Sequence, residues 1–146
     1  MSDGRRLLQI GEVAELVGLS LRTVRYYEEM GLIEPSGRSP GGFRLFDEEQ
    51  IKRLRILKGM KPVGLALDEI RELMELLDRT SSLDELDAET LVELADRLSR
   101  YEELTAERVE RLKRHVAEGI KLHDWIEGSL QACRAALQHA AASRSG

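Results

Sequence analysis

Residues 10–31 carry the sequence IGEVAELVGLSLRTVRYYEEMG, and this stretch decides the fold. Its apolar residues recur at helical spacing on both sides of a glycine, as Ile10, Val13, Ala14 and Val17 and then Leu21, Val24, Tyr27 and Met30. Gly18 can adopt the positive φ that ends the first segment, and Ser20 can cap the next. Two short helices joined by a three-residue turn are typical of a helix-turn-helix motif.

A short β-structure is predicted directly after this motif. Residues 34–42, EPSGRSPGG, are dense in Pro, Gly and Ser and therefore predict a loop. Residues 43–46, FRLF, alternate Arg44 with apolar neighbours, which is typical of a short strand. Residues 33–46 together predict a two-stranded wing.

Two further helices follow the predicted wing. Asp47 and Gln50 form a capping pattern before a helix whose inward residues are Ile51, Leu54, Leu57 and Met60. We expect Pro62 and Gly64 to end that helix. Its basic residues are expected to form a solvated face: Lys52, Arg53, Arg55 and Lys58. The next helix is predicted over 67–78, with an apolar stripe of Leu67, Ile70, Leu73, Met74 and Leu77.

The rest of the chain predicts one long helix, or two consecutive ones, over residues 88–138. Apolar residues spaced three and four apart form the expected dimerisation seam: Leu91, Leu94, Leu98, Tyr101, Val109, Leu112, Val116 and Ile126. The spacing slips by about one residue between Tyr101 and Val109, so the seam is not continuous in register. We expect residues 79–87 to form a linker and residues 139–146 to form a frayed tail.

Composition excludes several classes of protein. The 146 residues carry a net charge of −5, but residues 1–62 hold 11 basic against 9 acidic side chains and the remainder 11 against 18. A basic first half and an acidic second half indicate two different roles. A single cysteine excludes an internal disulfide framework and predicts a reducing compartment. No apolar run is long enough to cross a bilayer, so we expect a cytoplasmic protein.

This order of elements resembles the MerR family of bacterial transcription regulators. The matching segments are IGEVA at 10–14, TVRYYE at 23–28, GLI at 31–33, GFRLF at 42–46 and GLALDEI at 64–70. The resemblance implies a mainly α fold, with a winged helix-turn-helix head over residues 8–78 and a long C-terminal dimerisation helix in an antiparallel coiled coil. Phe43 and Phe46 stand where the family usually has Tyr, and Ala66 where a Ser commonly caps the fourth helix.

The resemblance also implies a function. Two heads on a homodimer would bind a two-fold operator within a promoter and distort the DNA to control transcription by RNA polymerase. Two alternatives remain open at this point. One is an architectural or excisionase-like DNA-binding protein, and the other is a coiled-coil module that binds another protein.

The candidate DNA contacts follow from the second helix, which would enter the major groove, and from the wing, and the family pattern adds Lys61 beside Pro62. They are Ser20, Arg22, Thr23, Arg25, Tyr26, Tyr27, Arg38, Arg44 and Lys61. An arginine can bridge O6 and N7 of guanine, and tyrosine hydroxyls commonly hold phosphates. Tyr27 could pack in the core instead, and Arg25 could pair with Glu28 or Glu29.

The sequence supports neither a metal site nor a catalytic site. His115, His123 and Cys133 are the soft ligands of the predicted long helix, and their spacing does not bring them to one side of it. No Ser-His-Asp arrangement and no glycine-rich phosphate loop is present, so we expect no enzyme. No cofactor is evident, and any effector is undefined by the sequence.

Overall fold

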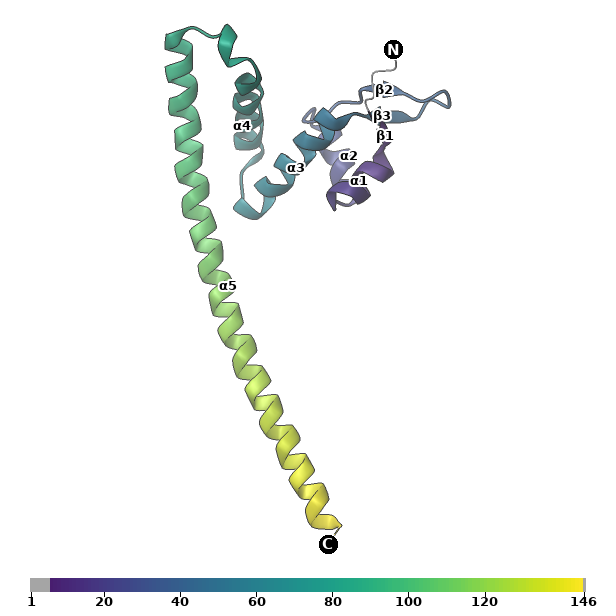
Figure 1. Ribbon diagram of the computed structural model, residues 1–146, viewed down its shortest axis with the longest axis vertical. Coiled ribbons are helices and arrows are strands. Elements are labelled where there is room, and N and C mark those ends of the chain that lie inside the picture. The colour runs from purple at the N-terminus through teal and green to yellow at the C-terminus, as the bar shows by residue number, and fades with distance from the viewer. Residues whose placement is uncertain (1–5, 146) are drawn as a thin grey trace. The chain divides into compact units, whose positions relative to one another are not determined.

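The computed structural model describes residues 6–145. The chain divides into two compact units, one up to Glu103 and one from Leu104. The first unit contains a small sheet, helices α1 to α4 and the beginning of α5, and the second is the rest of α5 (Figure 1). The predicted mainly helical class is confirmed. No helix within residues 6–145 is long and apolar enough to cross a membrane.

The helix-turn-helix forms where it was predicted. Helix α1 spans Ile10–Val17 and α2 spans Leu21–Glu29. Gly18 has φ of 71°, and the amide of Leu19 donates to the carbonyl of Ala14 over 2.9 Å. The Ser20 hydroxyl accepts from the amide of Thr23 over 3.1 Å, so the predicted cap is confirmed.

The wing sheet has three antiparallel strands in the order β1-β3-β2, although two were predicted. Strand β1 is Leu8–Gln9, β2 is Gly37–Arg38 and β3 is Arg44–Phe46. The unpredicted strand β1 places Leu8 opposite the fully buried Phe46. Two residues are too few to show an alternating pattern, and therefore the sequence gives no signal for β1.

Helix α3 spans Glu48–Val63, and its four predicted inward residues are buried. The Asp47 carboxylate accepts from the amide of Gln50 over 3.1 Å, which confirms the cap. The prediction that Pro62 ends the helix was wrong, because Pro62 lies inside its last turn. A proline there removes only one intrahelical hydrogen bond, and Gly64, with φ of 71°, ends the helix.

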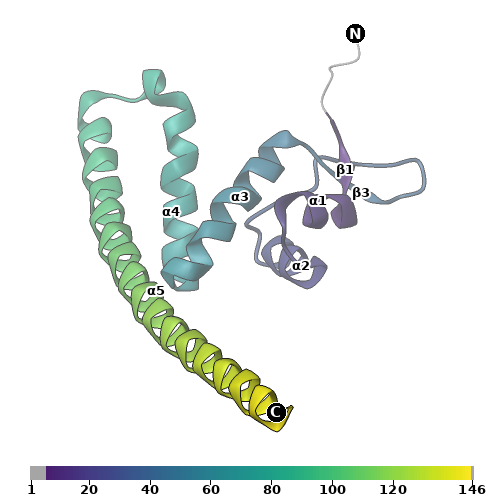
Figure 2. The same ribbon diagram turned by 60° about the horizontal axis from the view of Figure 1, so that its bottom comes forward.

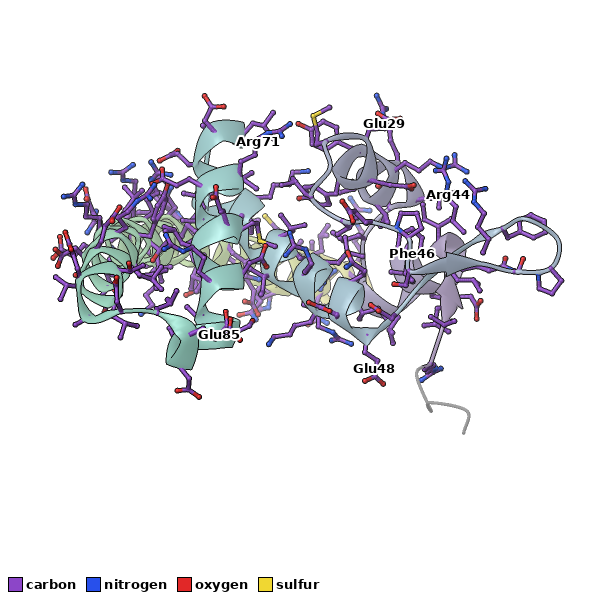
Figure 3. All side chains as sticks on the ribbon, turned by 90° about the horizontal axis from the view of Figure 1, so that it is seen from above. Glu29, Arg44, Phe46, Glu48, Arg71 and Glu85 are labelled. Atoms are coloured by element: carbon purple, nitrogen blue, oxygen red, sulfur yellow. The ribbon has the colours of Figure 1, made fainter. Side chains whose placement is uncertain are left out.

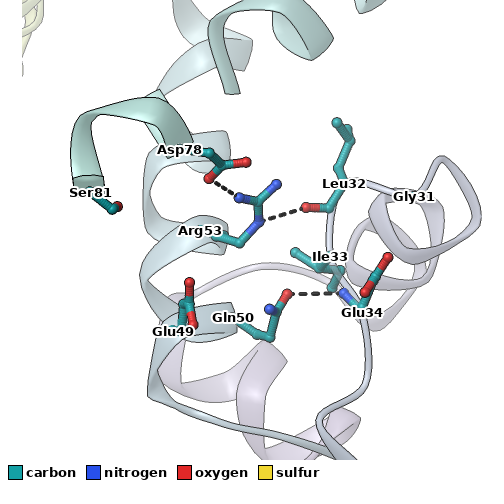
Figure 4. A pocket seen from close by; sticks show the side chains of 9 residues that line it. All are labelled: Gly31, Leu32, Ile33, Glu34, Glu49, Gln50, Arg53, Asp78 and Ser81. Atoms are coloured by element: carbon teal, nitrogen blue, oxygen red, sulfur yellow. Dashed lines mark hydrogen bonds and ion pairs between the residues drawn. The ribbon is translucent and has the colours of Figure 1, made fainter. Parts of the chain in front are cut away.

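Two basic residues of α3 hold the neighbouring elements. Lys58 Nζ donates to the carbonyl of Val17 over 2.8 Å, at the C-terminus of α1. Arg53 Nε donates to the carbonyl of Leu32 over 3.0 Å, and its guanidinium pairs with Asp78 of α4 (Figure 4). The predicted solvated face was therefore wrong for Arg53, which is half-buried, whereas Lys52, Arg55 and Lys58 are exposed and only the Lys58 ammonium reaches a main-chain carbonyl. Helix ends leave carbonyls without intrahelical partners, and cations satisfy them well.

Helix α4 spans Leu67–Arg79 and α5 spans Ala88–Arg144. A 3₁₀ helix, η1 (Thr80–Glu85), occupies most of the predicted linker. Helix α5 continues through Gly119 and ends at Arg144, beyond the predicted end at residue 138. The expected frayed tail at 139–146 is thus helical up to Arg144, and residue 146 lies outside the described residues.

Helix α4 and the first part of α5 lie side by side as a hairpin (Figures 1 and 2). Arg97 and Tyr101 of α5 donate to the two carboxylate oxygens of Glu72 on α4, over 2.5 and 2.9 Å. Leu94 is only 2% exposed, and Leu91, Leu98 and Tyr101 are half-buried. Of these four residues, which were predicted to begin the dimer seam, Leu94 is buried within the chain itself and the other three stay partly exposed.

The hairpin contact shifts the pKa values of Glu72, Arg97 and Tyr101, and that of Arg97 is raised by its hydrogen bond to Glu72. The hydrogen bonds from Arg97 and Tyr101 lower the pKa of Glu72. Burial, followed by the hydrogen bond to the Glu72 carboxylate, raises the pKa of Tyr101 to about 12. The Glu72 contribution to stability is therefore present above its unfolded pKa and is lost as the pH falls through its folded value.

Replacing Lys58 should destabilise the head. Lys58→Met keeps an apolar stem but leaves the Val17 carbonyl without its cationic donor, so we expect the free energy of unfolding to fall by about 1 kcal/mol. Urea denaturation followed by circular dichroism measures the change. Lys52→Met, on an exposed position of the same helix, is the matched control and should change little. Equal stability of the two variants would contradict a structural role for Lys58.

Tyr101→Phe should raise the pKa of Glu72 toward its ordinary value, because the carboxylate loses one of its two donors. The variant should therefore lose less stability than the natural chain on acidification. Carbon-13 NMR titration of the glutamate carboxyl groups measures the pKa directly. Tyr26→Phe, at an exposed tyrosine of α2, is the control, and an unchanged Glu72 in Tyr101→Phe would refute the contact.

Candidate nucleic-acid interface

Helix α2 presents one buried face and one polar face. Val24 and Tyr27 are buried against the rest of the head, whereas Arg22, Arg25 and Tyr26 are exposed. The Thr23 hydroxyl lies 2.8 Å from the Ser20 hydroxyl, which ties it to the helix cap. The polar face therefore offers two guanidinium groups and a phenol on a helix whose orientation is fixed by burial of its other side.

Tyr27 belongs to the core of the head. Its side chain is only 5% exposed, and burial, with the neighbouring Tyr26, raises the pKa of its hydroxyl. The two tyrosine rings lie 5.8 Å apart between centroids at a tilt of 54°. Of the two alternatives that the sequence left open, the packing role is the one that this burial favours.

A hollow joins α2 to the end of α3. It has a volume of about 480 Å³ and is lined by Arg22, Thr23, Tyr26, Tyr27, Lys61, Leu65 and Ile70. It brings Lys61, which is distant in sequence, to the same concavity as Arg22 and Tyr26. Two cations and a phenol above an apolar floor are suited to hold an anionic group with an apolar skeleton, such as a sugar phosphate.

Arg25 lies on the outer side of α2 and lines a shallow hollow with Leu21, Arg22, Tyr26 and Glu29. Among residues 6–145 it makes no hydrogen bond or ion pair, so the expected alternative of a pair with Glu28 or Glu29 does not form. The carboxylate of Glu28 is instead bound by Arg44. Arg25 therefore keeps all its donors available to a ligand.

The wing contributes two arginines. Arg38 and Arg44 are directly opposite each other in the antiparallel pairing of β2 and β3, so their side chains share one face of the sheet. Arg38 Nη1 donates to the carbonyl of Gly42 over 3.2 Å and stabilises the turn. Arg44 lies close to α2 (Figure 3) and pairs with Glu28 over 2.7 Å. Like charges in this register repel unless an anion compensates them.

The pair between Glu28 and Arg44 was not predicted from the sequence. A signal for it was present, because Glu28 follows Tyr27 and lies one helical turn after the buried Val24. An acidic residue beside a buried face needs a cationic partner. Which cation supplies it depends on the path of the wing, and the pattern of one helix does not contain that path.

A polar pocket of about 450 Å³ lies between α3, α4 and the segment after α2 (Figure 4). Its two central groups are already engaged within the chain. Arg53 binds Leu32 and Asp78, and Gln50 accepts from the amide of Glu34 over 2.9 Å. The pocket is therefore part of the scaffold that joins α3 to its neighbours.

The described part of the chain contains no arrangement of side chains that indicates a metal site or a catalytic site. No group of three or more His, Cys, Asp or Glu side chains within residues 6–145 is placed to hold a metal ion. Cys133 is an exposed free thiol, and His123 lies 3.9 Å from Glu127 on the same helix. These residues form no constellation for nucleophilic catalysis.

The second unit exposes the remaining predicted seam residues. From residue 109 onward every described side chain is exposed, including Val109, Leu112, Val116 and Ile126. Trp125 is the largest of these exposed apolar groups and lines a shallow hollow with Leu122 and Cys133, among others. A single helix cannot bury such a stripe by itself.

Comparison with known families matches the first unit. A model described as MerR HTH family regulatory protein matches residues 8–77. The chain is 40% identical over 82 residues to the nodulation protein NolA of Bradyrhizobium elkanii, covering 56% of this chain and 36% of NolA. It is 42% identical over 71 residues to a probable heavy metal-dependent transcriptional regulator of Haemophilus influenzae, covering 49% and 56%. The chain thus spans about a third to a half of the length of these relatives.

Solved structures share the fold. HiNmlR, a MerR family regulator lacking the sensor domain, solved bound to promoter DNA, has a TM-score of 0.58 at 23% identity and covers 76% of this chain and 79% of that one. A MerR family regulator from Bacillus thuringiensis has a TM-score of 0.56 at 22% identity, covering 77% and 93%.

Proposed function

Through residues 8–77 the chain belongs to the MerR family of helix-turn-helix regulatory proteins, and we propose that it is a sequence-specific, homodimeric DNA-binding regulator of transcription. The observation that carries this proposal is the polar face of α2. Arg22, Arg25 and Tyr26 are exposed there on a helix that is fixed from behind by its buried residues. This is the arrangement that a recognition helix needs in the major groove.

The proposed contacts divide by chemistry. Arg22 and Arg25 are suited to read guanine edges, each such bidentate contact being worth about 1–3 kcal/mol of discrimination. Tyr26, Lys61 and the capped N-terminus of α2 at Ser20 and Thr23 are suited to hold phosphates. Arg38 and Arg44 of the wing would meet phosphates or the minor groove beside the bases that α2 reads.

The homodimer rests on the exposed stripe of α5. Val109, Leu112, Val116 and Ile126 recur at the spacing of a coiled-coil seam, and the chain does not cover them. A second copy running antiparallel, as the family implies, would bury this stripe and place one head at each end. Two heads related by a two-fold axis would bind an inverted repeat.

The proposed effect on transcription follows from the binding of both heads of one dimer to the same DNA duplex. We propose that binding within a promoter distorts the DNA and thereby changes how RNA polymerase engages it. The deformation energy depends on base pairs that the protein does not touch, so it adds indirect readout to the direct contacts. The fold shared with HiNmlR, which was solved on promoter DNA, supports this arrangement.

Selection of DNA from a genomic pool by the purified protein tests the function. We expect enrichment of an inverted repeat near promoters, with an affinity that falls steeply as salt rises. Arg22→Ala should weaken binding about tenfold or more, whereas Lys52→Ala, an exposed charge on α3, should change it little. Enrichment at recombination sites would support the architectural alternative. An absence of enrichment at low salt would contradict DNA reading.

Val116→Asp should separate the dimer, because it places a charge in the proposed seam. Sedimentation equilibrium should then report the mass of one chain, and binding to an inverted repeat should weaken toward that of a single half-site. Val92→Asp is a closely matched control, since both valines lie on α5 and are 61% and 62% exposed. A dimer that withstands Val116→Asp would contradict this seam.

A further inference from the structure

The ion pair between Glu28 and Arg44 joins the two elements that carry the candidate interface. Glu28 Oε1 on α2 lies 2.7 Å from Arg44 Nη1 on β3. The two side chains differ in their surroundings, because that of Glu28 is 13% exposed and that of Arg44 is 51% exposed. The Glu28 carboxylate is therefore largely buried in the head, while about half of the surface of the Arg44 side chain is exposed.

The Glu28 carboxylate is incompletely satisfied. Its second oxygen, Oε2, is buried and has no hydrogen-bond partner among the residues that the structure describes. Burying a carboxylate with one partner costs desolvation energy that a single ion pair does not fully repay. An apolar side chain would serve packing at least as well. The arrangement is thus better explained by what it does to Arg44 than by a gain in stability.

What the pair fixes is the direction of the Arg44 side chain. A guanidinium has five N–H donors in a rigid plane, and Glu28 Oε1 engages one edge of it. Among residues 6–145 the other donors make no further hydrogen bond, and the half-exposed side chain belongs to the sheet face that Arg44 shares with Arg38. An arginine held in this way loses less conformational entropy when it binds a phosphate.

We propose that Glu28 is a positioning residue for DNA binding, which holds the Arg44 guanidinium at a set place beside α2 so that its outward donors meet a backbone phosphate. The inference rests on the proposed function. Glu28 itself does not touch the DNA. Because the pair connects α2 to β3, it also fixes the spacing between the base pairs under α2 and the phosphate under the wing.

The positioning role and simple charge repulsion predict opposite changes in DNA affinity when Glu28 is removed. A negative charge near DNA repels phosphates, so its removal should strengthen binding if charge alone matters. If Glu28 orients Arg44, its removal should weaken binding to the selected sequence, because Arg44 becomes mobile. The effect must also disappear when Arg44 is absent.

The experiment measures affinity for the selected DNA as a function of salt in Glu28→Gln and Glu29→Gln. Glu29 is the matched control, since it is the next residue of α2, is exposed and does not pair with Arg44. We expect Glu28→Gln to weaken binding about tenfold and Glu29→Gln to leave it equal or slightly stronger. In an Arg44→Ala background, Glu28→Gln should cause no further loss.

Thermal denaturation establishes that each variant is folded. If the glutamine amide of Glu28→Gln impairs folding, Glu28→Met is the second variant, because it removes the buried charge and fills its space. Glu28→Met should weaken DNA binding as much as Glu28→Gln. Arg44→Lys, which keeps the charge but loses the planar fork, should also bind less tightly. If the natural chain selects no DNA sequence, the proposed function fails. If it does and Glu28→Gln binds as well as Glu29→Gln, the positioning role fails.

Discussion

The winged head depends on the way α3 supplies cations to main-chain carbonyls of the elements around it. Lys58 binds the last carbonyl of α1, and Arg53 binds the carbonyl of Leu32 just after α2 while pairing with Asp78 of α4. Helix ends and tight turns leave carbonyls without partners, and a buried unpaired carbonyl is costly. The apolar side of α3 supplies the burial, and these two cations set the orientation. The helix-turn-helix, α4 and the segment between them are thereby held on one scaffold.

The candidate interface consists of side chains that this scaffold leaves exposed to solvent. Val24 and Tyr27 fix one side of α2, so its arginines and Tyr26 face away from the core. The end of α3 brings Lys61 to the same hollow, and the pair between Glu28 and Arg44 attaches the wing. Basic side chains from three separate segments are thus presented by α2, its hollow and the wing, in a chain that is acidic as a whole. The local distribution of charge, and not its sum, is what a nucleic acid would meet.

Helix α5 changes its role along its length. Its first turns pack against α4 through Leu94, Arg97 and Tyr101, and from residue 109 onward its apolar residues are uncovered. The slip in spacing between Tyr101 and Val109 coincides with this change, because the first stretch packs against α4 while the second is exposed, and the two need not share a register. One continuous helix therefore forms an intramolecular hairpin first and then leaves an exposed apolar stripe, where we propose the dimer seam.

The sequence by itself determined the helices and most of their buried faces, although Leu21 is exposed and Leu76, not part of the predicted stripe of α4, is buried. The helix-turn-helix, the caps at Ser20 and Asp47 and the inward residues of α3 follow from spacing and from side chains within three or four positions, which are local properties of the chain. Tertiary structure alone decided the strand β1, the bonds of Lys58 and Arg53, the partner of Glu28 and the covering of Leu94. Each of these joins residues far apart in sequence, through loops whose paths no periodic pattern encodes. The sequence around a charged helical residue does not show whether its side chain contacts solvent or a distant main-chain carbonyl. Only the folded backbone determines which of the two lies within hydrogen-bonding distance.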